Sequence, residues 1–121
     1  KISAKDLAKY MIMHINYGAL PNGDRIISEE SSRLMQSPVF EIGEGESYGL
    51  ALRQTSNFIP GEDMVGHTGS AYGLYSAMFF EPEKKFGIVL ITNGCKPLYE
   101  EGFVNIQTDV ARALYDIFIK K

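Results

Sequence analysis

Near the N-terminus, apolar side chains recur every three or four residues, which is the spacing of an amphipathic helix. The recurring positions are Leu7, Met11 and Ile15. Ser3 stands before the first of them, where its hydroxyl can cap a helix, and Gly18 stands after the last, where glycine commonly ends one. The pattern therefore predicts a helix between Ser3 and Gly18.

A second, shorter helix is predicted after a polar turn. Ser28, Glu29 and Glu30 place a capping hydroxyl and negative charge where a helix begins, and Pro38 ends it. Residues 1–38 are therefore predicted to be a helical segment. His14 falls near the C-terminal end of the first helix, where we expect a structural role for it beside the exposed carbonyl groups.

From residue 47 to residue 92 the apolar positions alternate, which is typical of strands. Turns rich in glycine and proline separate four predicted strands, at Tyr48–Gln54, Met64–Ser70, Leu74–Phe80 and Phe86–Thr92. Because short turns join antiparallel strands, the pattern predicts an antiparallel meander over residues 47–92. The acidic, glycine-containing stretch 41–46 is interpreted as a solvated loop, since its spacing does not match a calcium-binding loop.

The C-terminal part carries one apolar stripe at helical spacing, which predicts a helix over residues 103–119. The stripe consists of Phe103, Ile106, Val110, Leu114, Ile117 and Phe118. Helices at both ends with strands between them predict an α+β fold, in which the terminal helices cover one face of the sheet. The whole chain, 1–121, is predicted to be a single domain.

Composition narrows the range of functions. Apolar residues make up 45% and charged residues 22% of the 121, which is typical of a folded globular domain. Twelve Lys and Arg against fifteen Asp and Glu give a net charge of −3 with no basic stripe, which argues against a nucleic-acid partner. No apolar stretch approaches the roughly 20 residues of a membrane-spanning helix. The usual metal and nucleotide motifs are absent, so we expect no metal and no cofactor.

The most informative polar cluster is His67-Thr68-Gly69-Ser70, at the end of a predicted strand. Strand alternation places His67 and Gly69 on one face, and Gly69, lacking a Cβ, leaves room there for a ligand. At a sheet edge, free backbone N–H groups could bind a developing oxyanion. An ordinary hairpin turn with a partly exposed histidine uses the same residue types, and the residues alone leave both interpretations open.

Cys95 also allows two interpretations. A cysteine nucleophile with His67 as its base is one, and a small, inert thiol is the other. Nothing near Cys95 in the sequence indicates an activated thiolate, which favours the inert thiol. As a single cysteine, it can form no disulfide within the chain.

Three segments together resemble a known family. The runs 66–76 and 80–93, with Tyr48-Gly49-Leu50-Ala51-Leu52 before them, resemble the C-terminal part of the serine β-lactamase and penicillin-binding-protein-like family, nearest to its class C and esterase branch. The helical segment at 1–38 resembles the helices that precede the sheet in that family. The resemblance covers most of the chain in the right order, and it implies that 1–121 is a partial domain.

The resemblance implies roles for particular residues. In that family a Ser-x-x-Lys motif supplies nucleophile and base, a Tyr-x-Asn motif transfers protons, and a Lys-Thr-Gly strand completes the pocket. Only the third has a counterpart here, His67-Thr68-Gly69. By this resemblance the catalytic residues are His67 and Ser70, which gives a backbone N–H to the oxyanion hole. Thr68, Gly69 and Asn93 bind substrate, Gly69 by leaving space for the acyl group.

His67 stands where the family has lysine. An imidazole is largely neutral near pH 7 and recognises a carboxylate less strongly than an ammonium group does. The difference favours an esterase or D-amino-acid peptidase over an enzyme acting on penicillin-type substrates.

Two hypotheses follow. In the first, the chain is the C-terminal segment of a serine acyl hydrolase that acts on a small-molecule ester, a β-lactam or a D-amino-acid peptide, and is inactive alone because it lacks the nucleophile; the resemblance also suggests an extracytoplasmic location. The start at Lys1, without an initiator Met, fits a piece of a longer protein. In the second, it is a non-catalytic binding or assembly module whose edge strand Phe86–Thr92 pairs with a second copy, which gives a homo-oligomer, or with the missing N-terminal half.

Overall fold

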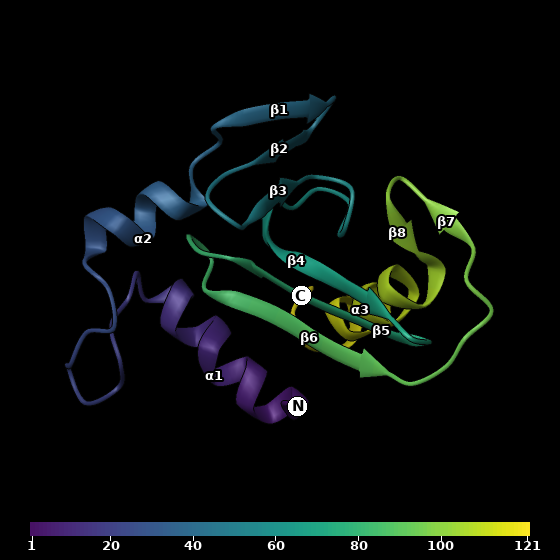
Figure 1. The fold of residues 1–121 in the computed structure, drawn as a ribbon, viewed down its shortest axis with the longest axis horizontal. Coiled ribbons are helices and arrows are strands. Elements are labelled where there is room, and N and C mark those ends of the chain that lie inside the picture. The colour runs from purple at the N-terminus through teal and green to yellow at the C-terminus, as the bar shows by residue number, and fades with distance from the viewer.

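The computed structural model of the protein describes residues 1–121 and has an α+β fold, as predicted (Figure 1). Its elements are α1 (Ala4–Ile15), α2 (Glu29–Gln36), β1 (Phe40–Gly43), β2 (Glu46–Tyr48), β3 (Arg53–Thr55), β4 (Met64–Ala71), β5 (Leu74–Glu81), β6 (Phe86–Thr92), β7 (Tyr99–Glu100), β8 (Phe103–Val104) and α3 (Asn105–Phe118). Strands β1 to β6 form one antiparallel sheet in chain order, and β7 pairs with β8. None of the helices combines the length and apolar character needed to cross a membrane.

The terminal helices cover opposite faces of the sheet, so the expectation that they share one face is wrong. Met11 and Ile15 of α1 pack in one cluster with Met78 and Phe80 of β5. The alternate residues of β5 belong to a second cluster, on the side of α3, which consists of Phe58, Ile59, Met64, Ala77, Phe79, Ile88, Leu90, Phe103 and Ala111. Successive residues of a strand point to opposite faces, and the apolar run along β5 therefore needs a covering layer on each side.

The sheet has six strands, two more than predicted, because the segment before β4 is divided differently. The predicted strand Tyr48–Gln54 is wrong: β2 ends at Tyr48, β3 begins at Arg53, and Ala51 between them has a φ of +62°. The stretch interpreted as a loop forms the hairpin of β1 and β2 instead. All four residues of β1 are exposed, so no buried face gives this strand an apolar alternation that the sequence could reveal.

The C-terminal helix begins two residues later than predicted. Phe103 and Val104 are buried in β8, and α3 starts at Asn105. Gln107 accepts a hydrogen bond at 2.9 Å from the backbone N–H of Val104, which stabilises the start of the helix. Phe103 thus belongs to the core, as its place in the apolar stripe predicts, but from a strand.

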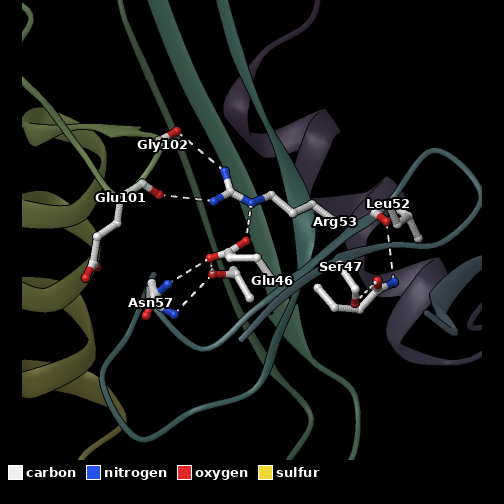
Figure 2. Close-up of polar contacts among 9 residues, drawn as sticks. Glu46, Ser47, Leu52, Arg53, Asn57, Glu101 and Gly102 are labelled. Atoms are coloured by element: carbon white, nitrogen blue, oxygen red, sulfur yellow. Dashed lines mark hydrogen bonds and ion pairs between the residues drawn. The ribbon is translucent and has the colours of Figure 1, made fainter. Parts of the chain in front are cut away.

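A buried ion pair connects β2 and β3 to the turn between β7 and β8 (Figure 2). The Nε of Arg53 donates to the Glu46 carboxylate at 2.6 Å, and the side chains are 9% and 10% exposed. The same guanidinium donates to the carbonyl oxygen of Glu101 at 3.1 Å and lies 4.2 Å from the ring centroid of Phe103. Both charges are thereby compensated, and the short strand β3 is held in place.

His14 is buried between two aromatic rings. Its ring centroid lies 4.6 Å from that of Tyr10, edge-on, and 6.0 Å from that of Phe80, stacked. Neither ring nitrogen has a hydrogen-bond partner, and burial lowers the pKa of the imidazole. The role is structural, as expected, but the ring does not serve the carbonyl groups at the helix end; the carbonyl oxygen of His14 accepts from Gln36 instead.

Breaking the buried ion pair is expected to destabilise the fold. Arg53→Gln leaves the carboxylate of Glu46 buried without its charge partner, and such a loss typically costs about 3–5 kcal/mol of the free energy of unfolding. The measurement is urea denaturation. Arg33→Gln is the control, because its ion pair with Glu29 is about half exposed and such pairs contribute about 0–1 kcal/mol. Equally small losses in the two variants would contradict the structural importance of the buried pair.

The burial of His14 predicts a dependence of stability on pH. Because its pKa in the folded chain lies below the ordinary 6.5, the unfolded chain takes up a proton that the folded chain does not. This contribution to stability is complete above about pH 6.5 and is lost as the pH falls from there towards the lowered pKa. We expect His14→Phe to flatten this part of the profile in urea unfolding; parallel profiles for the two proteins would refute the assignment.

Candidate functional site

The segment His67–Ser70 lies in the half of β4 that pairs on one side only. Strand β3 pairs with β4 from Met64 to Gly66, whereas β5 pairs with it from Val65 to Ala71. From His67 onwards the strand therefore has an open side, with backbone groups that no neighbouring strand satisfies.

The turn between β4 and β5 determines which backbone groups face that open side. Tyr72 and Gly73 have φ values of +53° and +81°, as in a type I′ turn, and Ala71 pairs with Leu74 across it. In such a turn the flanking residues are hydrogen-bonded to each other, and the bonding direction alternates along the strand. The N–H of Ser70 consequently points away from β5, towards the open side.

The side chains of the segment alternate between the two faces of the sheet. His67 pairs with Met78 and Gly69 with Ser76, which places both on the face covered by α1, as alternation predicts. A Cβ at Gly69 would overlap the hydroxyl oxygen of Ser76. The absent side chain therefore allows the hydroxyl group of Ser76 to lie close against the strand at Gly69.

A cavity of about 300 Å³ lies beside this segment, between α1 and the sheet. Its lining residues come from α1, the β2–β3 connection, β4 and β5: Leu7, Tyr10, Ala51, Leu52, His67, Thr68, Gly69, Ser76 and Met78. Three of the five candidate residues thus line the cavity, namely His67, Thr68 and Gly69, and Ser70 follows directly after them in β4. Backbone donors beside a small cavity suit the binding of a carbonyl oxygen.

His67 is exposed at this site. Its Nδ1 lies at hydrogen-bond distance from the carbonyl oxygen of Thr68, and its ring centroid lies 6.0 Å from that of Tyr48. The two rings approach edge-on from β4 and β2, and Tyr48 does not line the cavity.

Asn93 and Cys95 lie apart from the cavity. Asn93 is exposed directly after β6, and β5 separates that strand from β4. Cys95 lies two residues further along and is half-buried. Neither residue lines the cavity that contains His67, so the geometry gives no support to a cysteine nucleophile with His67 as its base.

Sequence reasoning missed the wall of the site that α1 provides. Leu7 belongs to the apolar pattern of the first helix and Tyr10 does not, and neither marks a wall of the site until the face of the sheet that α1 covers is known. The strand partners of His67 and Gly69 can be predicted from the sequence, because the two-residue turn fixes the register of β4 and β5. These partners are Met78 and Ser76. No group of three or more His, Cys, Asp or Glu side chains is placed to hold a metal ion.

Comparison with known proteins identifies the family. The model of the beta-lactamase family matches residues 1–111. The chain belongs to the beta-lactamase family. A curated relative, penicillin-binding protein 4 of Amycolatopsis lactamdurans, is 30% identical over an alignment of 100 residues that covers 77% of this chain and 25% of that protein. The chain therefore spans about a quarter of the length of this relative.

Family membership confirms the resemblance drawn from the His67–Ser70 segment and its neighbours. For a member of the beta-lactamase family, the chain contains few of the motif residues. It has neither Ser-x-x-Lys nor Tyr-x-Asn at any of its serines or tyrosines. The site in these 121 residues therefore consists of the open edge of β4 and the cavity beside it, and it has no serine nucleophile of that motif.

Proposed function

We propose that the chain supplies the oxyanion-binding strand of a serine acyl hydrolase whose Ser-x-x-Lys nucleophile lies outside these 121 residues. The substrate is a small-molecule ester, a β-lactam or a D-amino-acid peptide. The observation that carries the proposal is the N–H of Ser70 on the open side of β4, next to the cavity at Gly69. That the chain spans a quarter of a penicillin-binding protein supports a parent of greater length.

In the proposed reaction, the serine oxygen attacks the carbonyl carbon of the substrate and gives its proton to the neighbouring base. The negative charge that develops on the carbonyl oxygen is stabilised by the N–H of Ser70. The bond to the alcohol or amine then breaks, the leaving group takes up a proton, and an acyl-enzyme remains. Water attacks this ester, which releases the acid and restores the serine.

The other candidate residues have binding roles in this proposal. His67 lies exposed beside Tyr48 and orients the substrate as a donor or acceptor of a hydrogen bond. Thr68 and Gly69 line the cavity that receives the acyl group. Asn93 contacts only a substrate that reaches across the ends of β5 and β6. An imidazole at His67, in place of the ammonium group of lysine, favours esters and D-amino-acid peptides over penicillin-type substrates.

The oxyanion role is tested by removing one N–H group. In the longer polypeptide that carries the nucleophile, Ser70→Pro is expected to lower kcat by about 10²–10³-fold, because one oxyanion donor is lost. Proline is tolerated where the N–H faces away from the neighbouring strand. Ser70→Ala is the matched control, since it keeps the N–H and is expected to retain most activity. Equal effects of the two substitutions would contradict the proposal, as would a parent sequence without Ser-x-x-Lys.

The 121-residue chain alone provides a second arm of this test. We expect it to hydrolyse neither nitrocefin nor p-nitrophenyl acetate above the rate of the buffer. Turnover that disappears when His67 is replaced or Cys95 is blocked would show that the chain holds a nucleophile of its own.

A second candidate function, assembly with another copy of the chain, rests on the outer edge of β6. This strand pairs only with β5, and its seven residues carry no charge. A cavity of about 240 Å³ lies beside it, lined by Ile88 and Val89 with Leu114 and Phe118 of α3, and Phe118 is 74% exposed. A second β6 could extend the sheet there while Phe118 becomes buried.

Analytical ultracentrifugation distinguishes this candidate. Assembly through β6 predicts a dimer whose dissociation constant rises in Phe118→Ser, because apolar surface at the interface is lost. Phe40→Ser is the control: Phe40 is 67% exposed, on β1 at the opposite edge of the sheet. A monomer at high concentration, or equal weakening by both substitutions, would argue against assembly through β6.

A further inference from the structure

A second cavity, of about 230 Å³, lies on the side of the sheet that α3 covers. It is formed between the last turns of α3 and the connection from β3 to β4. Its lining residues are Ile59, Pro60, Arg112, Tyr115, Asp116 and Lys120. None of them lines the cavity beside His67, which lies under α1, and the proposed function makes no use of them.

Arg112 brings a positive charge to this cavity that no carboxylate of the chain neutralises. Its guanidinium donates to two backbone carbonyl oxygens, that of Phe58 at 3.3 Å and that of Asn57 at 3.0 Å. Arg112 takes part in none of the ion pairs of the structure. A guanidinium group has five N–H donors in a planar fork, so donors remain for a carboxylate bound in the cavity.

Asp116 provides the opposite charge one helical turn away. Residues four apart share one side of a helix, but Arg112 and Asp116 form no ion pair, since the guanidinium is bonded to the β3–β4 connection instead. Asp116 lies 3.6 Å from the ammonium group of Lys120, and both side chains are mostly exposed. Such a pair contributes little to stability, so the ammonium group of a ligand can replace Lys120 at little cost.

The rest of the lining is apolar. The hydroxyl of Tyr115 donates to the carboxylate of Glu62, which also pairs with Lys84, so Tyr115 has only its ring to offer to the cavity. Ile59, which is 1% exposed, and Pro60 complete this wall. The cavity thus combines a guanidinium, a carboxylate that it does not pair with, and an apolar surface.

These three features match the groups of a free α-amino acid. Such a molecule carries a carboxylate, an ammonium group and a side chain on one carbon atom, and the cavity offers a counterpart to each. A ligand with a carboxylate alone would bring a second negative charge beside Asp116. The volume lies below the range of about 300–1,000 Å³ that is usual for sites of drug-sized molecules, which limits the ligand to the size of one amino acid.

We propose that the cavity between α3 and the β3–β4 connection binds a free α-amino acid with an apolar side chain. Its carboxylate binds Arg112, its ammonium group binds Asp116, and its side chain contacts Ile59. The inference does not rest on the proposed function, because the two sites share no residue and lie on opposite faces of the sheet.

The test is a set of NMR titrations of the 121-residue chain, followed at the methyl groups of Ile59 and the Nε–H of Arg112. The ligands are both enantiomers of leucine, isocaproate, which lacks the ammonium group, and isoamylamine, which lacks the carboxylate. The tighter-binding enantiomer of leucine is expected to bind at least about tenfold more tightly than either analogue, because each analogue loses one charge-assisted contact. Glycine is expected to bind several-fold more weakly than leucine, since it buries no apolar side chain.

A substitution at Asp116 identifies the ammonium site. Asp116→Asn is expected to weaken leucine binding about tenfold and not to weaken isocaproate binding, because only leucine uses this carboxylate. Asp109→Asn is the matched control: it removes the same charge from an exposed aspartate of α3 outside the cavity, and is expected to change neither affinity. Circular dichroism of each variant establishes that it is folded.

Four results would overturn the inference. Equal affinities for leucine and isocaproate would remove the role of Asp116, and equal affinities for leucine and isoamylamine would remove that of Arg112. Equal weakening by Asp116→Asn and Asp109→Asn would reduce the effect to the overall charge of the helix. An absence of shifts at Ile59 with leucine at tens of millimolar, or shifts confined to Leu7 in the other cavity, would show that this cavity binds no amino acid.

Discussion

The pairing of β4 with β5 is the constraint on which the rest of the structure depends. A two-residue turn at Tyr72 and Gly73 fixes its register, and Gly66 allows the close approach, since a Cβ there would overlap the backbone of Met78. Shifting this register by one residue would turn every side chain of β4 to the other face. His67 would then leave the cavity, and the N–H of Ser70 would point into the sheet.

The register also explains the two layers of helix. Each residue of β5 from Ala77 to Phe80 is buried, and alternate members belong to different clusters, so α1 and α3 are required on opposite faces. The strand β3, held by the buried guanidinium of Arg53, ends its pairing at Gly66. This early end creates the open side of β4, and α1 closes the cavity beside it. The candidate site therefore depends both on where β3 ends and on which residues β4 contains.

The sequence was most informative where an apolar run was long and bounded by turn residues. The strands β4, β5 and β6 lie within a residue of their predicted bounds, because each is a run of seven or eight residues between glycine- or proline-containing turns. The hairpin of β1 and β2 was not predicted, since an exposed hairpin without a buried face has no such run. The buried pair of Arg53 and Glu46 was not predicted either, because it depends on contacts that only the folded chain brings together.

The central claim, that the N–H of Ser70 faces the open side of β4, is tested most directly by backbone amide hydrogen exchange in the 121-residue chain. The account predicts slow exchange at Gly69 and Ala71, whose N–H groups bond to β5, and fast exchange at Thr68 and Ser70, whose N–H groups have no strand partner. Protection at Ser70 equal to that at Gly69 and Ala71 would contradict it.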